Sequence, residues 1–149
     1  MRTTGPGRGD RGAAAVEFAL VVVPLLYLVF GVIEYGYMLS VRQAISQAAA
    51  EGARAAAVTT GDPQTAARAA VTDALSGYSL VCEAGGHLTS DSQIVGECTV
   101  GDPAECVSGT AEAECVRLTL AYDYEPLVGF GFGFLLPDRL VYTTDVQVG

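Results

Sequence analysis

Four cysteines are the residues with the clearest covalent chemistry in this sequence, and all of them stand in its second half, at Cys82, Cys98, Cys106 and Cys115. An even number of cysteines in a small domain on the oxidising side of a membrane indicates two disulfides. Free buried thiols and a zinc site are the alternatives. Zinc is disfavoured because there is no C-x-x-C pair and His87 is the single histidine. Three pairings are possible; Cys82 and Cys98 flank a polar loop as cross-strand partners in a hairpin would, so we expect 82–98 with 106–115.

Catalytic side chains are scarce. The chain has no lysine, and it contains no G-x-S-x-G, Walker A, H-E-x-x-H or EF-hand pattern. The acidic pairs Glu112 with Glu114 and Asp123 with Glu125 are more typical of a solvated surface than of acid–base catalysis. We therefore expect a protein that is not an enzyme and that needs neither a cofactor nor a metal.

An apolar stretch near the N-terminus carries two carboxylates at its ends. No charged residue stands between Phe18 and Ile33. A membrane-spanning helix needs roughly 17–25 mostly apolar residues, so the stretch reaches that length only by taking in Glu17, Glu34 or both. The sequence therefore predicts a single membrane helix with a carboxylate near each end.

Charge is distributed unevenly on the two sides of this stretch. Three arginines and one aspartate precede Gly12, whereas five arginines and fourteen acidic residues follow from Ser40 onward. The positive-inside rule then places the N-terminus in the cytoplasm and the acidic domain outside the membrane. An acidic outer domain argues against binding to nucleic acid or to anionic lipid.

Gly12 begins a recognisable motif. Four small or apolar residues follow it, and then come Glu17 and Phe18, which resembles the processing site of type IV prepilins. The wider runs R-G-A-A-A-V-E-F-A-L, F-G-V-I-E-Y-G and R-Q-A-I-S-Q-A-A-A-E-G-A-R-A-A resemble the TadE-like family over about residues 11–57. These proteins are minor pseudopilins of tight-adherence (Tad, Flp-type) pilus systems.

The resemblance implies several properties. A prepilin peptidase would cut between Gly12 and Ala13. The partners would be other pilin and pseudopilin subunits, the pilus assembly platform and membrane lipid, and no nucleic acid.

Glu17 gains a specific role if the chain is cut there. A carboxylate inside a bilayer costs about 2.5–3.5 kcal/mol and should have a partner. Cleavage creates a cationic amine on Ala13, one helical turn away and roughly 6 Å along the axis. The amine could be the chain's own or, as the resemblance implies, that of a neighbouring subunit. The alternative is an interfacial glutamate at the edge of a plain anchor.

The helical pattern continues beyond the apolar stretch as a stripe with alternating steps of four and three residues. The expected packing positions on this stripe are Gly31, Glu34, Met38, Val41, Ile45, Ala48 and Gly52. A helix from Ala13 to Ala57 would be about 68 Å long, more than twice the hydrocarbon core of a bilayer. Its outer half must be covered by the chain's own outer domain, by other subunits, or by both on different sides. For Glu34, contact with lipid headgroups and a second intersubunit contact are both open.

The rest of the chain predicts a small outer domain. Asp62 and Pro63 begin a second helix that is expected to end at Gly77. Strands are expected at 80–83, 93–100, 114–125 and 139–148, with the last two forming an antiparallel pair. The Phe- and Gly-rich connection at residues 127–138 is either core or interface.

These elements together predict an α+β fold of pilin-like type, with a basic cytoplasmic leader (1–12), a transmembrane and assembly helix (13–57) and an extracytoplasmic α+β domain (58–149). The function expected from the resemblance is that of a minor pseudopilin in a single-pass membrane orientation, carried into an extracellular pilus after assembly. An unprocessed single-pass membrane protein with a ligand-binding outer domain is the alternative.

Overall fold

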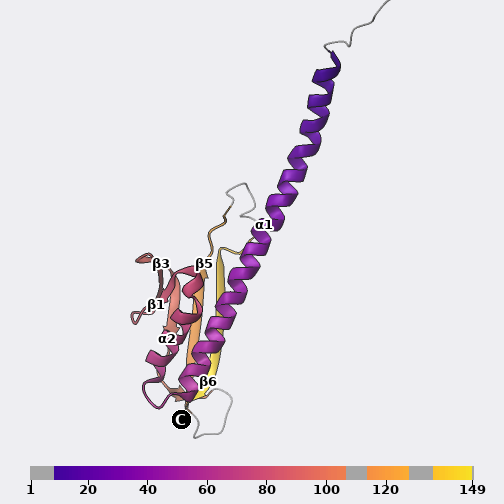
Figure 1. The fold of residues 1–149 in the computed structure, drawn as a ribbon. Helices are drawn as coiled ribbons and strands as arrows, with labels where there is room; N and C mark the ends of the chain where they lie inside the picture. The colour runs from indigo at the N-terminus through magenta and orange to yellow at the C-terminus, as the bar shows by residue number, and fades with distance from the viewer. Residues whose placement is uncertain (1–8, 107–113, 128–135, 149) are drawn as a thin grey trace, which may run out of the picture.

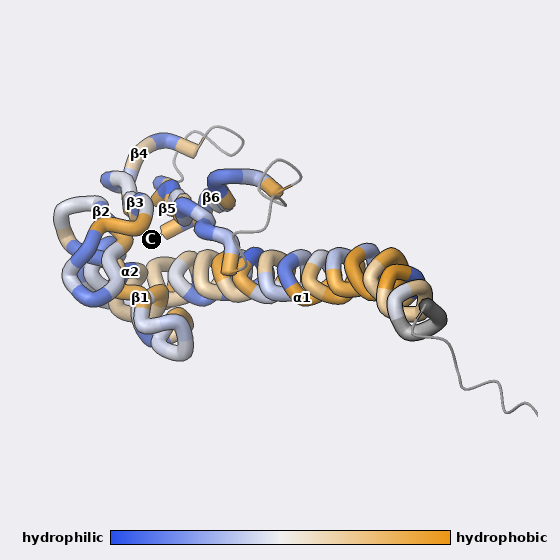
Figure 2. Tube along the Cα trace, turned by 90° about the horizontal axis from the view of Figure 1, so that it is seen from above, coloured by the Kyte–Doolittle hydropathy of each residue, from blue (hydrophilic) through white to orange (hydrophobic). Residues whose placement is uncertain are grey.

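A computed structural model describes residues 9–106, 114–127 and 136–148. The dominant element is helix α1 (Gly9–Val58), which is 50 residues long and contains Pro24 without ending there. Its N-terminal half projects away from a small domain that packs on its C-terminal half (Figure 1). Apolar residues predominate along the projecting half (Figure 2).

Helix α2 (Pro63–Ala74) lies against α1 and forms the second helix that the sequence predicts. The Asp62 carboxylate caps it by accepting a hydrogen bond from the Thr65 backbone N–H at 2.8 Å, and Pro63 occupies the first turn. The helix ends at Ala74 with Leu75 as its C-cap, and a short 3-10 turn η1 (Ser76–Tyr78) follows, so Gly77 lies in that turn and does not end the helix as expected.

The rest of the described domain is an antiparallel sheet. Its strands are β1 (Leu80–Cys82), β2 (His87–Ser90), β3 (Gln93–Val100), β4 (Ala104–Glu105), β5 (Glu114–Asp123) and β6 (Arg139–Val148). The strand order is β1-β2-β3-β5. Strands β3 and β4 pair with successive parts of one edge of β5, and β6 pairs with its other edge. Strands β5 and β6 form the expected antiparallel pair, in unbroken register from Glu114 opposite Val148 to Asp123 opposite Arg139.

Strands β2 and β4 were not expected from the sequence. Residues 80–83 and 93–100 were expected to form a hairpin around a polar loop, but β2 pairs with both β1 and β3 and lies between them. The Cys82–Cys98 disulfide thus connects two strands that are not adjacent in the sheet. The Cα atoms of these two cysteines are only 5.5 Å apart, which shows that the sheet curls between β1 and β3.

One face of the sheet and helix α2 enclose the core together with the outer half of α1. The alternating residues Val116, Leu118 and Leu120 of β5 are at most 1% exposed, as their period-two pattern predicts. Leu118 and Leu120 pack in one cluster with Val41, Ile45 and Ala48 of α1, which are at most 2% exposed, whereas Val116 packs in a second cluster with Ala56 of α1 and Ala67 of α2.

Strand β6 runs in the same direction as α1. Near its start, Leu140 borders the same groove as Ile45, and near its end, Val148 packs in one cluster with Ala56. Among the described strands, β6 pairs only with β5, so its other side is an open edge.

Candidate functional site

The projecting half of α1 is an uncovered apolar cylinder. Its most hydropathic 18-residue window has a mean hydropathy of 2.5, and none of that window is buried. Phe18 and Leu20 are 69% and 72% exposed. Residues 13–33 would extend about 31 Å, close to the thickness of the hydrocarbon core. This helix is therefore long and apolar enough to span a membrane.

The predicted cleavage and charge-pairing residues lie at the far end of this cylinder. Gly12, Ala13, Glu17 and Phe18 are all helical and exposed. No described atom would contact a Cβ placed on Gly12 within 4 Å. Within the part of the chain that the structure describes, Glu17 forms no ion pair.

Glu34 occupies a different environment from the one expected. It was expected to face headgroups or another subunit, but it is 1% exposed and is the one buried charged residue in the described part of the chain. Its Oε1 accepts a 2.6 Å hydrogen bond from the Tyr124 hydroxyl and a 3.1 Å hydrogen bond from the Leu127 backbone N–H. Both expectations for Glu34 were wrong, because its carboxylate anchors the outer domain to the helix.

Tyr124 completes this anchor. Its ring lies 6.2 Å from the ring of Tyr37, centroid to centroid. Burial raises the pKa of the Tyr124 phenol well above its ordinary value, and the hydrogen bond to Glu34 raises it further. The phenol is therefore a stable proton donor toward the carboxylate.

The helix-packing stripe is covered by the chain's own domain from Glu34 to Gly52. Met38, Val41, Ile45 and Ala48 are buried, and they face α2 and the sheet. Gly52 permits the closest approach, since a Cβ there would lie 2.6 Å from Val71 Cγ2 and 2.9 Å from Leu118 Cδ2. Gly31, one turn before the anchor, is only half-buried. The sequence left open whether the chain's own domain or other subunits cover this stripe. From Glu34 to Gly52 the chain's own domain covers it.

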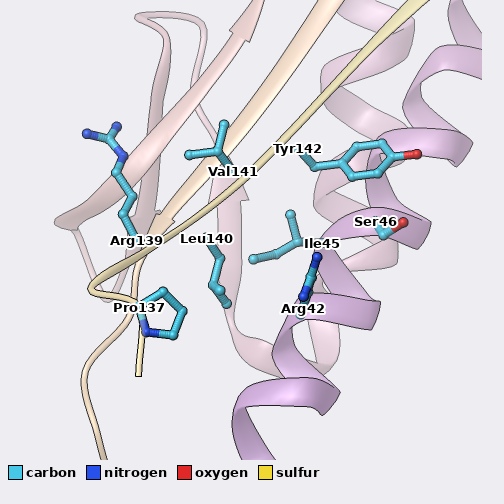
Figure 3. A pocket seen from close by; sticks show the side chains of 8 residues that line it. All are labelled: Arg42, Ile45, Ser46, Pro137, Arg139, Leu140, Val141 and Tyr142. Atoms are coloured by element: carbon cyan, nitrogen blue, oxygen red, sulfur yellow. The ribbon is translucent and has the colours of Figure 1, made fainter. Parts of the chain in front are cut away.

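A groove of about 430 Å³ separates α1 from the start of β6. Leu140 and Ile45 lie between strand and helix, whereas Arg139 points away from the helix (Figure 3). Arg139 forms an ion pair with Glu97 at 3.0 Å. The groove offers two guanidinium groups and hydroxyls but no carboxylate or imidazole, so its lining contains no acid–base pair. No group of side chains that could hold a metal ion occurs in the described ranges.

The cysteines form the two disulfides that the sequence predicts. Cys82 bonds to Cys98, and Cys106 bonds to Cys115 with the Cα atoms 5.0 Å apart. This is the pairing we expected, and it leaves no free thiol among the four cysteines.

Comparison with known families adds one match. The sequence model of the TadE-like protein family matches residues 12–54, from the predicted cleavage position almost to the end of α1. Most of helix α1 is therefore similar to the TadE-like family. Searches of curated proteins and of solved structures found no match to this chain.

The TadE-like match covers both halves of α1, the uncovered apolar half and the half that carries the domain. The outer domain lies almost wholly beyond the match. Of the Phe- and Gly-rich connection, residues 128–135 lie outside the described residues, and only its ends, Leu127 and residues 136–138, are placed.

Proposed function

We propose that this chain is a minor pseudopilin, a structural subunit in the assembly of a Tad or Flp-type pilus or a related secretion apparatus. Residues 1–12 are its cytoplasmic leader, residues 13–57 its membrane and assembly helix, and residues 58–149 its pilin-like extracytoplasmic domain. The observation that carries the proposal is the division of the TadE-like helix into an uncovered apolar half and a half buried in its own domain.

This division separates two roles. From Glu34 outward, one face of the helix is occupied by the chain's own sheet and α2, so it holds the domain. From Ala13 to Ile33 most of the helix surface is available to lipid and to neighbouring helices, and Leu136 borders it only near Tyr27, Leu28 and Val32. Lateral packing in the assembly takes place there, with Gly31 at its outer limit. The residues Met38, Val41, Ile45, Ala48 and Gly52 hold the domain, and their opposite face is the one open to other subunits.

Processing by a prepilin peptidase fits the exposed position of Gly12. A peptidase embedded in the membrane must reach the bond between Gly12 and Ala13, and nothing described in the chain covers Gly12. Cleavage removes the basic leader and leaves a cationic amine one turn from Glu17.

The fate of Gly12 tests the proposal. Mass spectrometry of protein extracted from membranes of cells that contain the peptidase should find Ala13 as the N-terminal residue. Gly12→Leu should block the cut, whereas Gly36→Leu, a matched change of an open glycine far from the cut, should not. An intact Met1–Gly12 segment on the assembled protein would overturn the proposal.

A further inference from the structure

We propose that the outer domain itself contacts the phospholipid bilayer through Leu127 and Leu136, here called the membrane-side end of the domain. The inference rests on the proposed function in one respect, namely that α1 spans the membrane with residues 13–33. It goes further because it assigns a lipid contact to residues that lie outside the helix.

The anchor at Glu34 determines the height of this end. The Leu127 backbone N–H donates to Glu34 at 3.1 Å, and Glu34 is the residue directly after the apolar span. Leu127 is therefore held at the level where the span ends. Leu136 reaches the span itself, because it borders one groove with Tyr27, Leu28 and Val32.

The chemistry of these surfaces suits lipid. The groove beside Leu136 is about 620 Å³ in volume, and its lining is almost entirely apolar. Leu127 is 59% exposed. Tyr35, which directly follows Glu34 in α1, is 55% exposed. Tyrosine is typical of membrane interfaces, where its ring lies among acyl chains and its hydroxyl among headgroups. This apolar surface is continuous with the uncovered span, so the bilayer that surrounds the span covers it too.

Nearby charges limit how deeply the domain enters. Glu125 and Asp138 are exposed and stand two residues from Leu127 and Leu136, respectively. Carboxylates are costly in hydrocarbon, so both must remain in water. The contact is therefore shallow, at the level of the headgroups and the first part of the acyl chains.

The test uses single cysteines in the full-length chain, reconstituted in phosphatidylcholine vesicles. All four native cysteines are in disulfides, so an introduced thiol can be labelled selectively with an environment-sensitive fluorophore. Leu127→Cys and Leu136→Cys report on the membrane-side end. Val23→Cys reports on the middle of the span. Val58→Cys is the matched control, since Val58 is 71% exposed and lies about 36 Å beyond Glu34 along the helix.

Quenching by brominated phosphatidylcholine distinguishes the outcomes. We expect the label at position 23 to be quenched most by bromines near the bilayer centre, the labels at 127 and 136 most by bromines near the headgroups, and the label at 58 by neither. Leu127 is more exposed than Leu136, so its variant remains informative if the second one fails to fold. Quenching at 23 with none at 127 would overturn this inference and leave the span intact. Absence of quenching at 23 would overturn the span, and the inference with it.

Discussion

Glu34 is a buried carboxylate whose hydrogen-bond donors come from a segment 90 residues later in the chain. A buried charge is tolerated only when hydrogen bonds replace its hydration. Tyr124 and Leu127 supply two such bonds at the end of β5. The interaction thereby fixes the outer domain to α1 at one height and in one rotational setting.

Replacing Glu34 by alanine should detach this end of the domain. The change leaves the Tyr124 hydroxyl and the Leu127 N–H without their acceptor, at a cost of about 2–3 kcal/mol in the free energy of unfolding. Urea unfolding of the detergent-solubilised chain measures it. Glu51→Ala is the control, because Glu51 forms only an exposed ion pair with Arg54 and its loss should cost less than about 0.5 kcal/mol. Equal effects of the two changes would contradict the anchoring role.

Tyr124 should make stability depend on pH in the alkaline range. Burial, and then the hydrogen bond to Glu34, raise its pKa in the folded chain, whereas in the unfolded chain the phenol loses its proton near pH 10. Below that pH both states keep the proton, and the stabilisation is complete. Above it only the unfolded state loses the proton, so the free energy of unfolding falls as pH rises.

The measurement is the urea midpoint at a series of pH values on both sides of this range. Tyr124→Phe should flatten the alkaline decline in part, because burial also raises the pKa of Tyr122. Tyr142→Phe, at a side chain that is 39% exposed, serves as the control. An alkaline decline that is unchanged in Tyr124→Phe would refute the assignment.

At the scale of the elements, Gly52 controls how closely α1 can approach α2 and β5. Gly52→Ala would place a methyl group 2.6 Å from Val71 Cγ2 and 2.9 Å from Leu118 Cδ2, so these side chains must move. Overpacking of this kind typically costs about 1–3 kcal/mol. Gly36→Ala on the same helix meets no atom within 4 Å and should instead be neutral or stabilise by about 0.5–1 kcal/mol. Thermal unfolding of the two variants, compared with the wild type, tests this difference in sign.

The elements with a strong hydrophobic period could be predicted from the sequence. The alternation in 139–148 gave the bounds of β6, and the stripe on α1 identified the face that the domain covers. Strand β2 was missed because Leu88 is its one buried residue, and a single buried position has no period. The anchor at Glu34 was missed for another reason. A polar residue beside an apolar span has the pattern of a surface residue, and nothing in the sequence near it points to Tyr124.

At the scale of the whole molecule, Glu17 is expected to act between subunits. It lies on the uncovered half of α1, far from the outer domain, so Glu17→Ala should leave the domain folded. Removal of a costly charge should leave membrane insertion intact or improve it. If Glu17 neutralises the Ala13 amine of a neighbour, assembly should fail nonetheless. Carbonate-resistant membrane association and the yield of sheared pili report the two effects separately, and loss of both or of neither would contradict this role.

The common direction of β6 and α1 restricts the symmetry of any dimer. Two β6 strands that paired antiparallel through their open edges would be related by a two-fold axis perpendicular to the sheet. That axis would also reverse one α1 helix, so the two spans would point to opposite sides of the assembly. Two copies inserted in the same bilayer with the same orientation cannot meet in this way. Insertion in one orientation, as proposed above, would thus protect a ten-residue strand edge from antiparallel self-pairing, to which such edges are otherwise prone.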